Sequence, residues 1–106
     1  MLMTMLLAAA VASATCPTSQ RGAALAAADL YDGPVREQAI LAPDTTARRR
    51  GTIVQHWAVD GVYRAGRHLT LRCAYTHRPP VFVAIRRPVS ACTMTQDHGH
   101  LTLGCR

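Results

Sequence analysis

Apolar and polar residues alternate with a period of two over most of the second half of the chain, and this pattern predicts antiparallel β-strands. The clearest alternation spans residues 69–75. The residues expected to face inward are Leu69, Leu71, Cys73 and Tyr75. Those expected to face outward, counting the preceding His68, are His68, Thr70, Arg72 and Ala74. Residues 52–59 and 81–86 repeat the pattern, and prolines, which cannot donate a ladder hydrogen bond, separate the segments around residues 79–80 and 88.

The first half of the chain has a weaker pattern. Residues 24–31, ALAAADLY, suit a helix or a strand by composition, and the Asp32-Gly33 turn that follows favours a short strand. Pro34 fits the first position of a helix, because its fixed φ is helical and its missing N–H needs no partner there. We therefore expect a helix of about two turns over residues 34–42, ended by Pro43, and a polar loop over residues 44–51.

The last hairpin predicts a strand register and, through it, a disulfide. If His98-Gly99 forms a two-residue turn, Asp97 faces His100 and Cys92 faces Cys105. Opposed cysteines in an antiparallel pair have a suitable separation for a bridge. The pair Cys92–Cys105 would leave Cys16–Cys73, although four cysteines allow three pairings.

The N-terminus has the features of an export signal. Residues 5–14, MLLAAAVASA, are apolar, too short to cross a bilayer as a helix, and end in a small-residue cleavage site. We expect a signal peptide over residues 1–14, cleavage near Ala14, and one domain over residues 15–106 in the periplasm or the medium. A buried N-terminal helix is the alternative, since no basic residue precedes the apolar run, and lipidation at Cys16 is a lesser one. An exported chain with four cysteines is expected to form two disulfides.

Together these elements predict an α+β fold. It would be mainly an antiparallel sheet of about five strands, with one short helix and two disulfides. The structural residues would be Asp32, Gly33 and Pro34 at the turn, and Trp57 and Tyr75 in the core.

Several short segments together resemble a family of small exported bacterial proteins without an established function. The segments are Cys16-Pro17, the YDGP of residues 31–34, the LAPD of residues 41–44, Trp57, the CAY of residues 73–75, Cys92 and Cys105. Val35 departs from the family pattern, which usually has a second proline at this position. The resemblance implies export and a disulfide-bonded antiparallel sheet, and it implies no chemistry.

The charge of the chain favours acidic partners. Its formal net charge is +6, and every one of its basic residues is an arginine. A basic domain is attracted to acidic proteins or to anionic lipids and glycans. Candidate binding residues that could form one basic surface are Arg48, Arg49, Arg50, Arg72, Arg86 and Arg87. The alternative is that these arginines are scattered charges that only aid solubility.

The sequence offers no catalytic arrangement. The acidic residues are dispersed, Ser90 lacks the flanking glycines of a nucleophile elbow, and the cysteines are assigned to disulfides. His98 and His100 lie beside Asp97 but have no third metal ligand nearby. The few aromatic residues provide no platform for nucleic-acid bases. We therefore predict no enzyme activity, no cofactor, no metal, no nucleic acid and no transmembrane segment.

These observations predict a non-catalytic protein-binding domain, inhibitor-like or immunity-like, with an unidentified protein partner. The alternative is an envelope-associated protein that binds anionic lipid or glycan, and a third possibility is a minor enzyme or metal protein. Salt separates the first two, because polyanion binding weakens strongly with salt and a shape-complementary interface does so much less.

Overall fold

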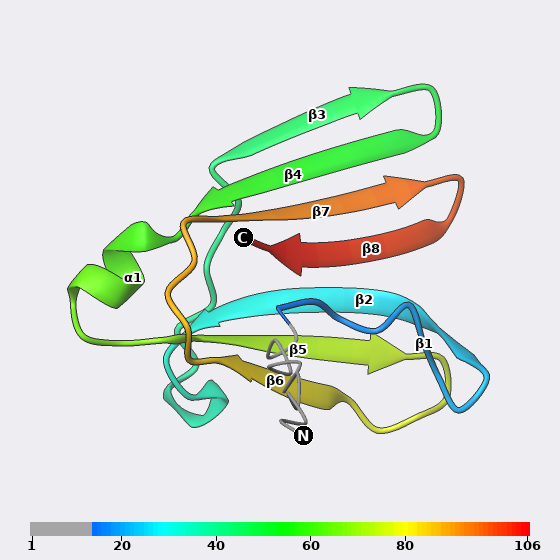
Figure 1. The fold of residues 1–106 in the computed structure, drawn as a ribbon. Coiled ribbons are helices and arrows are strands. Elements are labelled where there is room, and N and C mark those ends of the chain that lie inside the picture. The colour runs from blue at the N-terminus through cyan, green and yellow to red at the C-terminus, as the bar shows by residue number, and fades with distance from the viewer. Residues whose placement is uncertain (1–13) are drawn as a thin grey trace, which may run out of the picture.

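The computed structural model describes residues 14–106 of the chain, and this part forms two four-stranded antiparallel sheets (Figure 1). The strands are β1 (Ser19–Gln20), β2 (Ala23–Asp32), β3 (Thr45–Arg49), β4 (Thr52–Ala58), β5 (Leu69–Tyr75), β6 (Val81–Ile85), β7 (Ala91–Asp97) and β8 (His100–Cys105). One sheet has the order β1-β2-β5-β6 and the other β3-β4-β7-β8. A 3-10 helix, η1 (Val35–Glu37), and an α-helix, α1 (Asp60–Arg64), complete the described elements. The expected signal peptide, residues 1–14, lies outside this part apart from Ala14.

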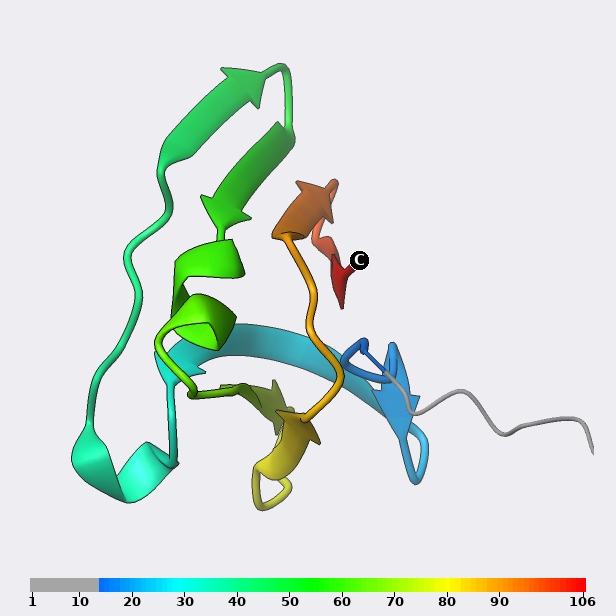
Figure 2. The same cartoon turned by 60° about the vertical axis from the view of Figure 1, so that its left-hand side comes forward.

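A single apolar core lies between the two sheets. Its members come from both, and they include Leu25, Leu30, Trp57, Leu69, Leu71, Cys73, Tyr75, Cys92, Leu101 and Leu103. The sheets contact each other where β8 approaches β2, whereas β3 and β4 extend away from the other sheet (Figures 1 and 2). The core is therefore concentrated at the β7–β8 side of one sheet, and the β3–β4 side is less covered.

The predicted fold class is confirmed in its coarse form, with mostly antiparallel strands, a short α-helix and two disulfides, but the number of strands was too low. The structure has eight strands in two sheets. The main omission is β3, in the segment that we expected to be a polar loop. All five residues of β3 are exposed, so this strand has no apolar alternation to reveal it. It forms by pairing with β4, through a turn in which Arg50 and Gly51 both have positive φ angles, +26° and +82°.

The helix expected over residues 34–42 is wrong. Only the 3-10 turn η1 forms, and the residue after it, Gln38, has a left-handed φ of +57°. The chain then returns to β2, where the Leu41 N–H donates to the Leu30 carbonyl over 2.9 Å. Pairing with β2 satisfies backbone groups that a two-turn helix would leave partly unpaired. The α-helix lies instead at α1, where Val62 is buried.

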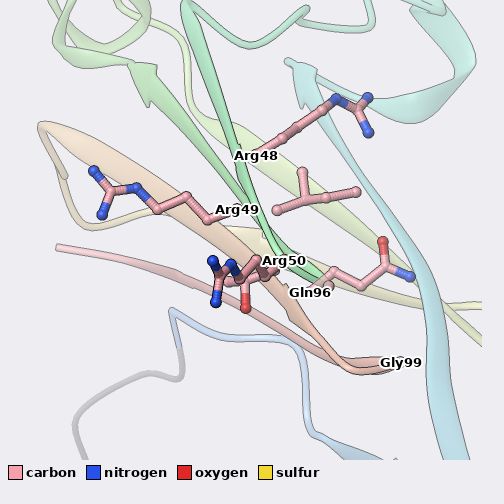
Figure 3. Close-up of a pocket in the computed structure, with 8 residues that line it drawn as sticks. Arg48, Arg49, Arg50, Gln96 and Gly99 are labelled. Atoms are coloured by element: carbon pink, nitrogen blue, oxygen red, sulfur yellow. The ribbon is translucent and has the colours of Figure 1, made fainter.

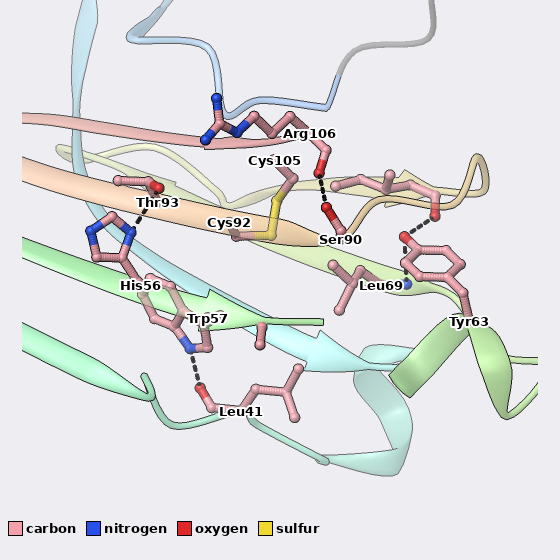
Figure 4. The surroundings of a disulfide bond; sticks show 12 residues. Leu41, His56, Trp57, Tyr63, Leu69, Ser90, Cys92, Thr93, Cys105 and Arg106 are labelled. Carbon is pink, nitrogen blue, oxygen red and sulfur yellow. Dashed lines mark hydrogen bonds between the residues drawn. A yellow bond between two sulfur atoms is a disulfide. The ribbon is translucent and has the colours of Figure 1, made fainter. Parts of the chain in front are cut away.

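The predicted hairpin register is confirmed. Cys92 lies opposite Cys105 and Asp97 opposite His100, across a turn in which His98 and Gly99 have φ angles of +47° and +83°. The structure contains the disulfides Cys92–Cys105 and Cys16–Cys73. Figure 4 shows Cys92–Cys105 between β7 and β8.

The second disulfide and a backbone hydrogen bond together connect the N-terminal segment to both sheets. The Cys16 N–H donates to the Leu103 carbonyl of β8 over 3.0 Å, while its sulfur is bonded to Cys73 of β5. Because β8 and β5 belong to different sheets, the hydrogen bond and the covalent bond together hold the N-terminal segment against both of them.

Polar side chains tie loops to the core. The Trp57 Nε1–H donates to the Leu41 carbonyl over 3.0 Å, as Figure 4 shows, and the Tyr75 hydroxyl donates to the Pro17 carbonyl over 2.5 Å. Thr70 was expected to face solvent, yet it is buried and its hydroxyl donates to the Gly33 carbonyl over 2.9 Å. The turn that holds Gly33 covers this end of the sheet, so alternation alone could not predict the burial of Thr70.

Candidate partner-binding surface

Three consecutive arginines lie at the end of the β3–β4 hairpin. Arg48 and Arg49 end β3, Arg50 begins the turn, and all three are exposed. Within residues 14–106 none of the three takes part in an ion pair, whereas Arg64, Arg67 and Arg72 do. The hairpin therefore carries a concentrated positive charge that the described part of the chain does not neutralise.

The two faces of this hairpin differ. Residues directly opposite each other in neighbouring strands share one face, so Arg48, Ile53, Gln96 and Leu101 form a row across the sheet on its core side. The neighbouring row consists of Thr46, Gln55, Met94 and Leu103. Arg49 shares the opposite face with Thr52 and Asp97. Figure 3 shows Arg48 and Gln96 directed to one side of the hairpin and Arg49 to the other.

Burial decreases along both core-side rows from β8 to β3. Leu101 and Leu103 are buried by the second sheet, whereas the β3 members, Thr46 and Arg48, are exposed. The core side is therefore only partly covered at β3 and at the adjoining end of β4, where Ile53 and Gln55 are half-buried. We call this surface the open shelf and define it as Thr46, Arg48, Ile53, Gln55 and Gln96. The shelf combines a positive charge, an aliphatic side chain and hydrogen-bonding groups.

A pocket of about 350 Å³ adjoins the shelf at the tip of the hairpin (Figure 3). It is lined by Arg48, Arg49, Arg50, Gly51, Thr52, Ile53, Gln96 and Gly99. Arginine guanidinium groups bind carboxylates through paired hydrogen bonds. The pocket is therefore suited to an acidic side chain of a partner.

The other predicted binding arginines lie elsewhere. Arg72 is in β5 of the second sheet, with its Nη1 3.7 Å from Asp29 Oδ2. Arg86 and Arg87 follow β6. The structure therefore brings only the three hairpin arginines together in one pocket.

Two histidines of the sheet that contains β3 and β4 form side-chain hydrogen bonds. His98 Nδ1 lies 2.6 Å from Asp97 Oδ1, and His56 Nδ1 lies 3.0 Å from the Thr93 hydroxyl (Figure 4). Hydrogen bonds from Thr52 and His98 lower the pKa of Asp97 below its ordinary value. Within residues 14–106, no three side chains of the metal-binding types gather to hold an ion.

Sequence reasoning missed the shelf residues Ile53, Gln55 and Gln96. Their alternation with outward residues is visible in the sequence, but their exposure depends on how far the second sheet reaches. The Thr-Thr-Ala-Arg-Arg sequence of residues 45–49 was the available signal for strand β3, because threonine has a high strand propensity.

These features define a disulfide-bonded β domain with an exposed, basic binding surface. The model of the family described as "Type VI secretion system Tli immunity protein" matches residues 18–106, and the chain belongs to this family. Neither the curated proteins nor the solved structures contain a match to this chain.

The family match confirms the main functional prediction. The protein is a protein-binding immunity domain of a family that is generally non-catalytic, and immunity proteins bind a toxin as their partner protein. It refines the resemblance to exported proteins without an established function, and it gives no support to the alternative of an anionic envelope component. No helix among residues 14–106 has the length and apolar character needed to cross a membrane.

Proposed function

We propose that this chain neutralises one particular toxin by forming a one-to-one complex with it, outside the cytoplasm. The observation that carries the proposal is the match of residues 18–106 to the immunity family. Binding without chemistry requires a rigid surface, because each loop that orders on association reduces the affinity. The two disulfides provide that rigidity in a small domain.

The basic hairpin supports an acidic contact region on the toxin. The charge of +6 would increase the rate of encounter with a negatively charged partner. We assign the first contacts to Arg48, Arg49 and Arg50, since these exposed arginines have no ion-pair partner within the described residues.

Co-expression in a sensitive bacterium tests the function. Type VI toxins of the native host are expressed one at a time in their normal compartment, with and without the full-length chain. We expect growth to be restored for one toxin and for none of the others. The rescuing pair is then purified, and we expect one-to-one stoichiometry by light scattering and binding that largely survives 0.5 M salt. A chain that rescues growth against no toxin, or that acts at far below equimolar amounts, would contradict the proposal.

The location outside the cytoplasm is supported by the leader-like residues 5–14 and by the two disulfides, since such bonds persist in oxidising compartments. Fractionation of cells that express the full-length chain with a C-terminal tag tests it. We expect a protein cleaved near Ala14, without free thiols, in the periplasm or medium. A cytosolic protein that retains its leader and has four free thiols would refute the location.

A further inference from the structure

We propose that the toxin contributes an acidic, extended segment that adds as a strand to the free edge of β3 and places a carboxylate on the open shelf beside Arg48. This inference rests on the proposed function, because it names the part of the chain that the toxin contacts and the chemistry of the contacting segment.

Among residues 14–106, only β4 pairs with β3, so its outer edge has no partner there, whereas the opposite edge of the same sheet is occupied. In β8, the Cys105 N–H donates to the Ala14 carbonyl over 2.8 Å, and the Leu103 carbonyl accepts from the Cys16 N–H. Residues 14–16 thus cover β8, while the only partner of β3 in the described part of the chain is β4. In an edge strand, alternate residues direct their N–H and C=O groups away from the sheet and can pair with another chain. This sheet can therefore be extended at β3.

An added strand would continue the rows of the shelf. The row that begins at the buried Leu101 passes through Gln96 and Ile53 to Arg48, and the next position along it lies on the added strand. A glutamate or aspartate at that position would be the direct cross-strand neighbour of Arg48, and opposite charges in such a pair stabilise the sheet. Strand pairing supplies the backbone hydrogen bonds, and this side-chain pair supplies the preference for an acidic segment.

The charges around the shelf select the sign of the partner. Asp97, which shares the opposite face with Arg49, already accepts hydrogen bonds from Thr52 and His98. A carboxylate on the core side would therefore meet Arg48 without a competing acidic side chain from the same row. A lysine-rich segment would instead be repelled by the positive charges of Arg48, Arg49 and Arg50.

The second sheet contains the strongest competing surface. The free edge of β6 carries Phe82, which is 51% exposed, opposite Arg72. However, Arg72 is ion-paired with Asp29, and prolines at positions 80 and 88 flank β6, as is common for edges that avoid pairing. We therefore choose β3, and Phe82 becomes a control in the test.

A synthetic peptide tests the surface without the toxin. The probe is a capped nine-residue peptide, Thr-Glu-Thr-Glu-Thr-Glu-Thr-Glu-Thr, and its control has lysine in place of each glutamate. Hydrogen exchange of the exported, disulfide-intact protein is followed with each peptide. We expect the glutamate peptide to slow exchange of alternate amides in residues 45–49, and the lysine peptide to have no effect. Protection around Phe82, or none anywhere, would overturn the proposal.

Adjacent arginines give a matched pair of variants. Arg48→Ala and Arg49→Ala remove the same charge one residue apart, from opposite faces of the hairpin. We expect Arg48→Ala to weaken binding of the glutamate peptide about tenfold and Arg49→Ala only about twofold, because only Arg48 would be paired directly. Equal losses would show that long-range charge alone acts, which would refute strand addition. Equal thermal midpoints for the two variants confirm that both are folded.

The co-expression assay connects the surface to the toxin. We expect Arg48→Glu to abolish growth rescue, whereas the control variant Phe82→Ala, on the other sheet, still rescues. If the native chain rescues and Arg48→Glu does so equally well, the surface is wrong and the proposed function stands. If the native chain rescues against no toxin, the proposed function fails, whatever the peptide shows.

Discussion

Removal of the Cys16–Cys73 disulfide should destabilise the protein more than removal of Cys92–Cys105. The cysteines of the first bond are 57 residues apart in sequence and those of the second only 13. Because a longer closed loop restricts the unfolded chain more, the chain-entropy relation assigns about 4 kcal/mol to Cys16–Cys73 and about 3 kcal/mol to Cys92–Cys105. Loss of Cys16–Cys73 should also release the N-terminal segment from the edge of β8, which widens the difference.

Urea unfolding of two double variants, Cys16→Ala/Cys73→Ala and Cys92→Ala/Cys105→Ala, measures these effects. The first variant loses two buried cysteine sulfurs, and the second loses the buried Cys92 sulfur and the half-buried Cys105 sulfur, so packing acts in the same direction as the loop entropy. Domains of this size have a free energy of unfolding of about 5–15 kcal/mol, so a loss of about 4 kcal/mol removes a large share of it. Circular dichroism follows the transition, and the m-values are compared to exclude a change in the denatured state. If the Cys92/Cys105 variant proved the less stable of the two, the entropic reasoning would be refuted.

The remaining predictions concern four single substitutions. Trp57→Phe should reduce the free energy of unfolding by about 1–3 kcal/mol, because the Leu41 carbonyl loses the hydrogen bond from the indole N–H. Urea unfolding followed by circular dichroism measures this loss, and an unchanged urea midpoint would contradict the prediction. Gly66→Ala should cost about 1 kcal/mol, since its φ of +75° is left-handed but its surroundings are open. Gly33→Ala should cost more in the same assay, because a Cβ there would also displace a neighbouring arginine, and equal losses would disprove this contact. Burial raises the pKa of Tyr63 above 10.0, so the stability of the protein should fall as the pH rises above the pKa of the unfolded tyrosine. Tyr63→Phe should reduce this alkaline decrease in melting temperature. A pH profile of the melting temperature that is the same in the variant would exclude a role for this hydroxyl.

The arrangement of covalent bonds explains how so small a domain can present a rigid binding surface. One disulfide joins the two strands of the last hairpin, and the other joins the N-terminal segment to the second sheet. The sheet that carries the basic hairpin is thus fixed at its β8 side, while β3 stays accessible at the other side. In the proposed complex, stability and binding would come from opposite edges of one sheet, so contact with a partner at β3 would require no rearrangement of the core.

The sequence by itself determined the elements whose signals are local. The alternation of Leu69, Leu71, Cys73 and Tyr75 predicted β5 with its buried face, since a half-buried strand needs an apolar residue at every second position. The turn at residues 98–99 predicted the register of β7 and β8, because a two-residue turn leaves one way to pair the flanking strands. The arginine run was visible as charge, and an immunity-like binding role followed from a basic disulfide-bonded domain without catalytic residues.

Only the tertiary structure decided which strands lie at the edges and which face stays open. Thr45–Arg49 reads as a polar loop, because a strand held by backbone hydrogen bonds at a sheet edge needs no apolar side chains. Thr70 is buried and Arg48 exposed for reasons that lie far away in sequence, namely the covering turn at Gly33 and the limited reach of the second sheet. Alternation specifies two faces for each strand, but the order of strands in the sheets determines which neighbours cover those faces, and that order depends on contacts across the whole chain.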